Sequence, residues 1–262
     1  MNRIDERFAK AKADGRKALI TFLTVGDPNL EVSEKAIYTM QEEGVDLVEL
    51  GVPFSDPAAD GPVIQRADER ALAQGVDIFK VFELVRKIRN NVEVPMVFLL
   101  YYNVMVQYGI EKFFKRCQET GVDGLIIPDL PYEESDEIKE YTEKYGVYQI
   151  SLVSPTSKDR IKNIAKDAKG FLYCISSLGV TGEKSSFVTN FDEFVGTIKK
   201  YTDVPACVGF GVSNGRQVKE LTKYFDGAIV GSAIVKSIAT GESVEERINN
   251  LREKIKDLKS GL

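Results

Sequence analysis

Short apolar runs alternate with longer amphipathic segments along the whole chain. The apolar runs are too short for helices. Their apolar content is nearly continuous rather than alternating, which is typical of strands in a parallel sheet that is buried on both faces. These runs predict strands at residues 18–25, 46–50, 95–101, 124–128, 148–153, 170–176, 205–210 and 227–231.

The segments between the runs repeat their apolar residues with the period of an amphipathic helix. Asp77 stands where an N-cap is expected for one of them. The pattern predicts helices at residues 31–43, 77–90 and 243–258. A further helix at 2–13 precedes the first strand and is placed to cover the bottom of a barrel, and a short helical pattern begins near Ser232, after the last strand.

Eight strand–helix units in a chain of this length favour a (β/α)8 TIM barrel, an α/β fold with an extra N-terminal helix and a short extra helix after strand eight. The alternative is an open doubly wound sheet. No G-x-G-x-x-G motif follows the first strand, and the count of eight suits closure. No linker or change of composition divides the chain, so residues 1–262 are expected to form one domain.

Composition narrows the class of protein. The chain has 262 residues, is 43% hydrophobic and 29% charged, and carries a formal net charge of −5, which argues against nucleic acid as its main ligand. The three cysteines lie far apart and are expected to be free buried thiols in a reducing compartment. The N-terminus lacks a signal-peptide pattern and no apolar run reaches membrane-spanning length, so we expect no membrane association and a cytoplasmic location.

Acidic residues gather at the carboxyl end of the second strand and in the loop that follows it. Glu49 ends a buried strand, where an acid is costly unless it has a function or a partner. Asp56 and Asp60 follow in a loop stiffened by prolines. Active sites of TIM barrels lie on this side of the strands, and the chain has no histidine, so these carboxylates are the leading candidates for proton transfer.

Glycines follow the seventh and eighth strands. Gly211, Gly231 and Ser232 are placed where barrels often hold a phosphate with backbone N–H groups and the N-terminus of a short helix. The alternative is that these glycines only form tight turns. A long polar segment after strand six, residues 178–190, contains two glycines and suits a mobile lid.

The residue types that are missing restrict the chemistry. No lysine lies in a predicted strand to form a Schiff base, and no histidine is present to hold a metal ion. The substrate must therefore supply its own electron sink, or the reaction is an isomerisation by proton shuttling.

Several candidate residues have structural alternatives. Glu49 could be a paired structural acid and Asp60 a solvated one, and Asp129 could be a partner for residues 101–103. Tyr173, if it faces inward, needs a partner for its hydroxyl, which Glu49 or Asp60 could provide. The apolar residues late in strands one, three and four either line a pocket for a flat ring or belong to the ordinary core: Phe22, Leu99 and Ile126.

Taken together, six motifs resemble the tryptophan synthase alpha subunit family. The longest and most specific is VELGVPFSDPAADGP at residues 48–62. The others follow in order along essentially the whole chain: FLTVGDP at 22–28, IPDLP at 127–131, GVTG at 179–182, GFG at 209–211 and VGSAIV at 230–235.

The resemblance implies cleavage of indole-3-glycerol phosphate to indole and glyceraldehyde 3-phosphate. In that reaction the protonated indole ring is itself the electron sink. By analogy with the family, Glu49 is the general acid–base, Asp60 holds the indole N–H and Tyr173 orients the carboxylates. The analogy places Phe22, Leu99, Tyr101 and Ile126 around the ring, places Gly182, Phe210, Gly211, Gly231 and Ser232 at the phosphate, and pairs Thr181 with Asp60 when the site closes.

The resemblance also implies a partner. The family's beta subunit carries pyridoxal phosphate and receives indole through a tunnel, in an expected α2β2 tetramer, while the alpha chain itself needs no cofactor or metal. Loops 53–62 and 179–190 would face that subunit, and Ala58 replaces what is commonly a larger apolar residue there. The alternatives are a free-standing indole-3-glycerol phosphate lyase, a phosphosugar isomerase on the same barrel, and a non-catalytic allosteric effector.

Overall fold

The computed structural model describes residues 2–157, 159–175, 190–209 and 211–262. In these ranges the helices are α1 (Arg3–Ala13), α2 (Leu30–Glu42), α3 (Pro62–Ala73), α4 (Ile78–Ile88), α5 (Tyr102–Tyr108), α6 (Ile110–Thr120), α7 (Asp136–Tyr145), α8 (Ile161–Asp167), α9 (Phe191–Lys199), α10 (Gly215–Leu221), α11 (Ser232–Ala239) and α12 (Val244–Lys259), with a 3-10 turn η1 at Tyr132–Glu134. The strands are β1 (Ala18–Thr24), β2 (Leu47–Gly51), β3 (Met96–Leu99), β4 (Gly124–Ile126), β5 (Tyr148–Gln149), β6 (Ser151–Val153), β7 (Leu172–Ile175), β8 (Ala206–Gly209) and β9 (Gly227–Val230).

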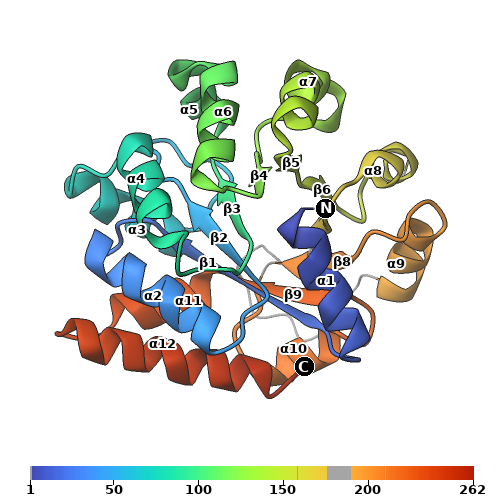
Figure 1. The fold of residues 1–262 in the computed structure, drawn as a ribbon. Helices are drawn as coiled ribbons and strands as arrows, with labels where there is room; N and C mark the ends of the chain where they lie inside the picture. Colours follow the sequence, from blue (N-terminus) through green and yellow to red (C-terminus); the bar gives the residue numbers. More distant parts are fainter. Residues whose placement is uncertain (1, 158, 176–189, 210) are drawn as a thin grey trace.

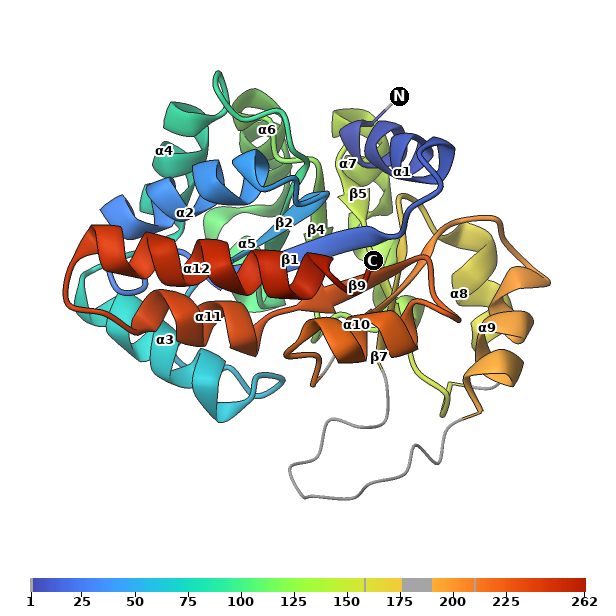
Figure 2. The same ribbon diagram turned by 90° about the horizontal axis from the view of Figure 1, so that it is seen from below.

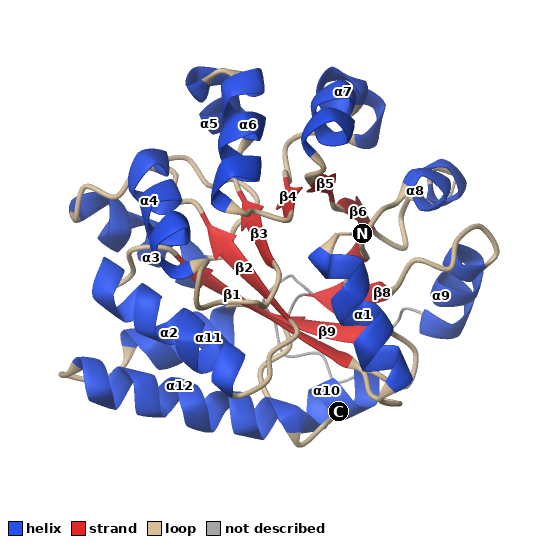
Figure 3. Ribbon diagram, in the orientation of Figure 1, coloured by secondary structure: helices blue, strands red, loops and turns tan. Residues whose placement is uncertain are grey.

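The strands form one parallel sheet inside a ring of helices (Figure 1 and Figure 3). Their order is β5-β4-β3-β2-β1-β9-β8-β7-β6. The two end strands, β5 and β6, are the halves of the single strand predicted at 148–153, interrupted at Ile150. Because β5 pairs with β4 and β6 pairs with β7, this one run of chain joins the two ends of the sheet. The predicted barrel is confirmed, and the open doubly wound sheet is set aside.

The predicted helices at 2–13, 31–43, 77–90 and 243–258 appear as α1, α2, α4 and α12, each within two residues of the expected bounds. Asp77 caps α4 by accepting a hydrogen bond of 2.9 Å from the Lys80 N–H. The helix α12 packs between α2 and α11 on the outside of the barrel (Figure 2). Between β2 and β3 the pattern predicted one helix, whereas the structure has two, α3 and α4.

The apolar core has an inner and an outer part. The inner part fills the barrel with side chains that include Ile20, Leu47 and Ile126, and α1 lies across one end of the barrel with Ile4 and Phe8 packed against it (Figure 1). The outer part lies between the sheet and the helices. The expectation that the N-terminal helix covers the bottom of the barrel is therefore confirmed.

Candidate active site

The alternation of side chains along the strands brings several predicted site residues together inside the barrel. Phe22 of β1 is in register with Glu49 of β2, and Leu99 of β3 is in register with Ile126 of β4. Glu49 is also in register with Val97, one pleat below Leu99. Phe22, Leu99 and Ile126 lie late in their strands, as expected, whereas Glu49 is the middle residue of β2 rather than its end.

Glu49 differs from the other buried acids at the strands. At the starts of strands, Asp46 is bound by Arg7 and Arg16 at 3.0 and 2.7 Å, and Asp123 is bound by Arg3 at 2.6 Å. Glu49 is 1% exposed, and among the described residues its Oε1 atom has no hydrogen-bond partner. Burial without a counter-ion raises the pKa of Glu49 from 4.5 to about 8, so it holds its proton at neutral pH.

Asp60 is held by Tyr101. The Tyr101 hydroxyl donates to Asp60 Oδ2 at 2.7 Å and accepts from the Ala59 N–H at 2.9 Å, and its ring stacks on Phe54 with the ring centroids 5.0 Å apart. Burial raises the pKa of Asp60, and the hydrogen bond from Tyr101 works in the opposite direction. Tyr101 was assigned to the indole ring from the family resemblance, and the structure gives it this additional contact with a carboxylate.

Tyr173 of β7 packs against the inner core of the barrel, so the condition set for its role, that it faces inward, is met. Its pKa is raised by burial and then by the negative charges of Glu49 and Asp60, which places its ring near both carboxyl groups. A Cβ atom on Gly209, in the neighbouring strand, would lie 2.6 Å from the Tyr173 hydroxyl, and one on Gly51 would lie 2.5 Å from the ring of Phe22. Two glycines inside the barrel therefore make room for two aromatic rings at the site.

The glycines after the last two strands have a suitable geometry for an anion. Gly211 is exposed with φ at +75°, and a Cβ atom there would meet nothing within 4 Å. Gly231 is the N-cap of α11, whose first turn has no side-chain cap, so its N–H groups remain available. A Cβ atom on Gly231 would lie 3.6 Å from Phe22, so this helix end adjoins the aromatic part of the site. Ser232 is exposed at the first position of α11.

Three predicted site residues, Thr181, Gly182 and Phe210, lie outside the described residues, as does nearly all of the predicted lid at 178–190. Asp129 takes the structural role considered for it, because both of its carboxylate oxygens accept from the Tyr102 N–H, at 2.9 and 3.1 Å.

One buried acid near the site was missed. Asp68, on α3, is 4% exposed, and its pKa is raised to about 8 by burial and by the charge of Asp60. The helical pattern of residues 62–73, with an acid on the same face as Ala67 and Ala71, was the available signal.

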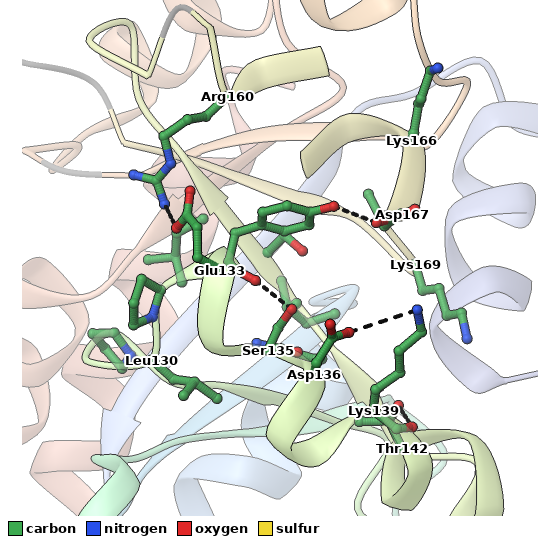
Figure 4. A pocket seen from close by; sticks show the side chains of 18 of the residues that line it. Leu130, Glu133, Ser135, Asp136, Lys139, Thr142, Arg160, Lys166, Asp167 and Lys169 are labelled. Carbon is green, nitrogen blue, oxygen red and sulfur yellow. Dashed lines mark hydrogen bonds and ion pairs between the residues drawn. The ribbon is translucent and has the colours of Figure 1, made fainter. Parts of the chain in front are cut away.

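A separate hollow lies on the flank of the barrel between α7 and α8 (Figure 4). This cleft of about 610 Å³ is lined by charged groups of both signs. Arg160 pairs with Glu133 across it at 2.5 Å, and Tyr132 donates to Asp167 at 2.5 Å. None of the predicted site residues lines it.

The parts of the chain described here contain no group of three or more His, Cys, Asp or Glu residues suited to a metal ion. Within the same ranges, no helix has the length and apolar character needed to cross a membrane. All three cysteines are buried and free.

Comparison with known proteins gives one consistent result. Residues 8–262 match the family model described as tryptophan synthase alpha chain. The chain is 47% identical over 262 residues to the tryptophan synthase alpha chain of Thermoanaerobacter sp. (strain X514), covering 100% of both chains. Among solved structures it is similar to tryptophan synthase subunit alpha from Legionella pneumophila, with a TM-score of 0.84, 34% identity and coverage of 98% of this chain and 99% of that chain. It is also similar to a structure of tryptophan synthase from M. tuberculosis in an open form, with a TM-score of 0.88, 32% identity and coverage of 99% and 98%.

Proposed function

This chain belongs to the tryptophan synthase alpha chain family of lyases, and on that premise we propose that the mouth of its barrel cleaves indole-3-glycerol phosphate into indole and glyceraldehyde 3-phosphate. The observation that carries the proposal is the buried carboxyl of Glu49, which is in register with Phe22, has no hydrogen-bond partner for Oε1 among the described residues, and has its pKa raised to about 8. An acid with that pKa is protonated at neutral pH yet close enough to titration to act as a base afterwards.

Glu49 begins the reaction as a general acid. It donates its proton to carbon three of the indole ring, which becomes an indolenine with a positive charge at the ring nitrogen. The carboxylate of Asp60 accepts the ring N–H and stabilises that charge, because opposite charges attract strongly in a site that excludes water. Tyr101 supports this role, since its hydrogen bond favours the ionised form of Asp60.

Glu49 then completes the reaction as a base. It removes the proton from the hydroxyl on the carbon attached to the ring, and a carbonyl group forms there. The bond between that carbon and carbon three of the ring breaks, and its electron pair passes into the ring to neutralise the nitrogen. Indole and the aldehyde leave, and Glu49 regains the proton it gave away, so no cofactor or metal ion enters the balance.

The remaining roles complete the proposal. Phe22, Leu99 and Ile126 would enclose the ring, and Tyr173 would orient the carboxyl groups. Gly211, Gly231 and Ser232 would hold the phosphate with backbone N–H groups, together with Gly182 and Phe210, and Thr181 would pair with Asp60 on closure.

A beta subunit is the proposed partner. It would carry pyridoxal phosphate, receive the indole and form an α2β2 tetramer with this chain in the cytoplasm. Loop 53–62 supports this, because Ser55, Asp56, Ala58 and Ala59 are exposed there although the two ends of the loop are fixed by β2 and α3. Loop 179–190 would form the other part of the contact.

The test is indole release from indole-3-glycerol phosphate, measured with and without a beta subunit. We expect release with both proteins present, and a reduction of about 10² to 10⁴ in kcat for Glu49→Gln, whose shape is retained but which can neither give nor take the proton. Binding of the substrate should persist in that variant. The matched control is Glu253→Gln, an exposed acid on α12 that is remote from the site. Wild-type turnover by Glu49→Gln would refute the assignment, and full turnover without a partner would favour a free-standing lyase.

A further inference from the structure

Helix α3 carries a buried acid that the proposed mechanism does not use. Asp68 is 4% exposed, whereas the acid next to it, Glu69, is exposed. The buried face of α3 consists of Ala67, Asp68 and Ala71. This face packs against β1 and α11, the two elements that frame the mouth of the barrel beside Phe22. An acid on such a face is expensive to ionise, so its neighbours decide its charge.

The neighbours of Asp68 are mainly acidic. Asp60 and Asp27 both act on it with negative charge, and Asp60 has the larger effect. Two arginines of α3 lie two residues from Asp68 in the sequence: Arg66 is exposed, and Arg70 is engaged by both oxygens of Asp27, at 2.7 and 2.9 Å. Within the described residues, no Lys or Arg nitrogen comes within 4.0 Å of the Asp68 carboxyl. Among the described residues, therefore, no counter-ion is in place to stabilise its charge.

The remaining elements around α3 add no compensation. From the end of β3, Tyr101 points its hydroxyl at Asp60 and is itself affected by the charge of Asp68. The only charged residue of α11 is Lys236, which is exposed. The Thr24 hydroxyl at the end of β1 lies near enough to lower the pKa of Asp68, although its geometry falls short of a regular hydrogen bond.

Burial and the charge of Asp60 together raise the pKa of Asp68 to about 8. When two acids are neighbours in a buried environment, the state in which one of them is protonated is more stable than the state in which both are ionised. Tyr101 donates to Asp60 and so favours the ionised form there, which leaves the proton on Asp68. At neutral pH the pair then consists of an ionised Asp60 and a neutral Asp68.

We propose that Asp68 is a positioning residue for Asp60: while protonated it leaves Asp60 ionised and seated against Tyr101, and when it ionises in alkaline solution it repels Asp60 from that seat. Asp60 is the group that moves, because it lies in a loop whereas Asp68 is fixed within α3. This inference rests on the proposed function at one point only, which is that Asp60 binds the indole nitrogen. Its consequence is an alkaline loss of activity that is separate from the titration of Glu49.

The first test is a titration that requires no turnover. The carboxyl carbons of 13C-labelled aspartate are followed by NMR in the full chain, and the Asp68 signal is identified by its loss in Asp68→Asn. We expect a midpoint near pH 8, shifted to lower pH in Asp60→Asn, where the neighbouring charge is gone. A midpoint in the ordinary range of aspartate, or one that Asp60→Asn leaves unchanged, overturns the proposal.

The second test is the pH dependence of kcat/KM for indole release. When activity requires the protonated form of a group whose pKa is about 8, the loss of that proton lowers kcat/KM about tenfold between pH 7 and pH 9. With Glu49 and Asp68 both required, the wild-type fall is about a hundredfold, and Asp68→Asn reduces it to about tenfold. Glu69→Gln, which removes the adjacent exposed acid, should retain the wild-type profile.

The two tests separate the possible failures. An Asp68→Asn profile that follows the wild type, or that is lowered equally at every pH, means that Asp68 is only structural and overturns the proposal. Absence of indole release at any pH counts against the proposed function instead, and the NMR titration still decides whether Asp68 and Asp60 share a proton.

Discussion

Replacing Glu49 by Gln should make the folded chain more stable while removing its activity. The pKa of Glu49 is about 8 in the folded chain, against 4.5 for an ordinary glutamate. The folded state therefore binds the proton more tightly than the unfolded state does. The favourable contribution of this proton is complete below about pH 4.5, decreases as the pH rises, and is fully lost above about pH 8.

The size of the effect follows from the same two values. Between pH 4.5 and about pH 8, each pH unit lowers the free energy of unfolding by about 1.4 kcal/mol through Glu49 alone. From pH 5 to pH 7 the wild type should lose about 2.5 kcal/mol through Glu49, and Glu49→Gln should lose none of it. Other titrating groups are common to both proteins, so they cancel in the difference.

The assay is urea unfolding at several pH values from 5 to 8, with the free energy of unfolding of each variant compared at every pH. Glu253→Gln is again the control, since it removes an exposed acid of α12 and leaves the barrel interior unchanged. The reasoning is refuted if the difference between Glu49→Gln and wild type stays constant across this range, or if it changes in the opposite direction.

Three further substitutions test separate parts of the site. Tyr101→Phe removes the hydrogen bond to Asp60, and we expect about a tenfold loss of kcat/KM, equivalent to about 1.4 kcal/mol, in the indole-release assay; unchanged kinetics would remove Tyr101 from the support of Asp60. Gly209→Ala places a methyl group 2.6 Å from the Tyr173 hydroxyl, and thermal or urea unfolding should show a loss of about 1–3 kcal/mol together with reduced kcat. Gly211→Asp adds a negative charge and a side chain at a φ of +75°, so calorimetry should find weaker binding of glycerol phosphate, and equal affinity would exclude this loop from the phosphate site.

Much of the fold could be predicted because barrel strands and helices are local patterns. Each buried strand is a short apolar run, and each outer helix has one apolar face, so the strand at 148–153 and the helices α1, α2, α4 and α12 were found close to their true bounds. The interruption at Ile150 could not be seen, since that run is apolar enough for one continuous strand. The helix α3 was overlooked because its run follows a polar loop directly and its buried face is made of small residues and an acid.

The candidate site divides in the same way. Glu49 and Asp60 could be proposed as site residues from their places in and after the second strand and from a long motif, both of which are visible along the chain. The contact between Tyr101 and Asp60 joins residues 41 positions apart, and Asp68 meets its acidic neighbours only after α3 has packed onto the barrel. Such contacts leave no periodic signal in the sequence.

By itself, the sequence determined the parallel barrel, the end of the barrel at which we propose the chemistry takes place, and the family to which the chain belongs. Only the tertiary structure decided the protonation states on which the proposed chemistry depends. The same type of carboxyl group is paired with arginines at Asp46, has no counter-ion among the described residues at Glu49, and feels the charges of two other acids, Asp60 and Asp27, at Asp68. The reason is physical: residue type and spacing fix where a side chain lies along its strand or helix, but its charge depends on the burial and the neighbours that distant segments bring to it.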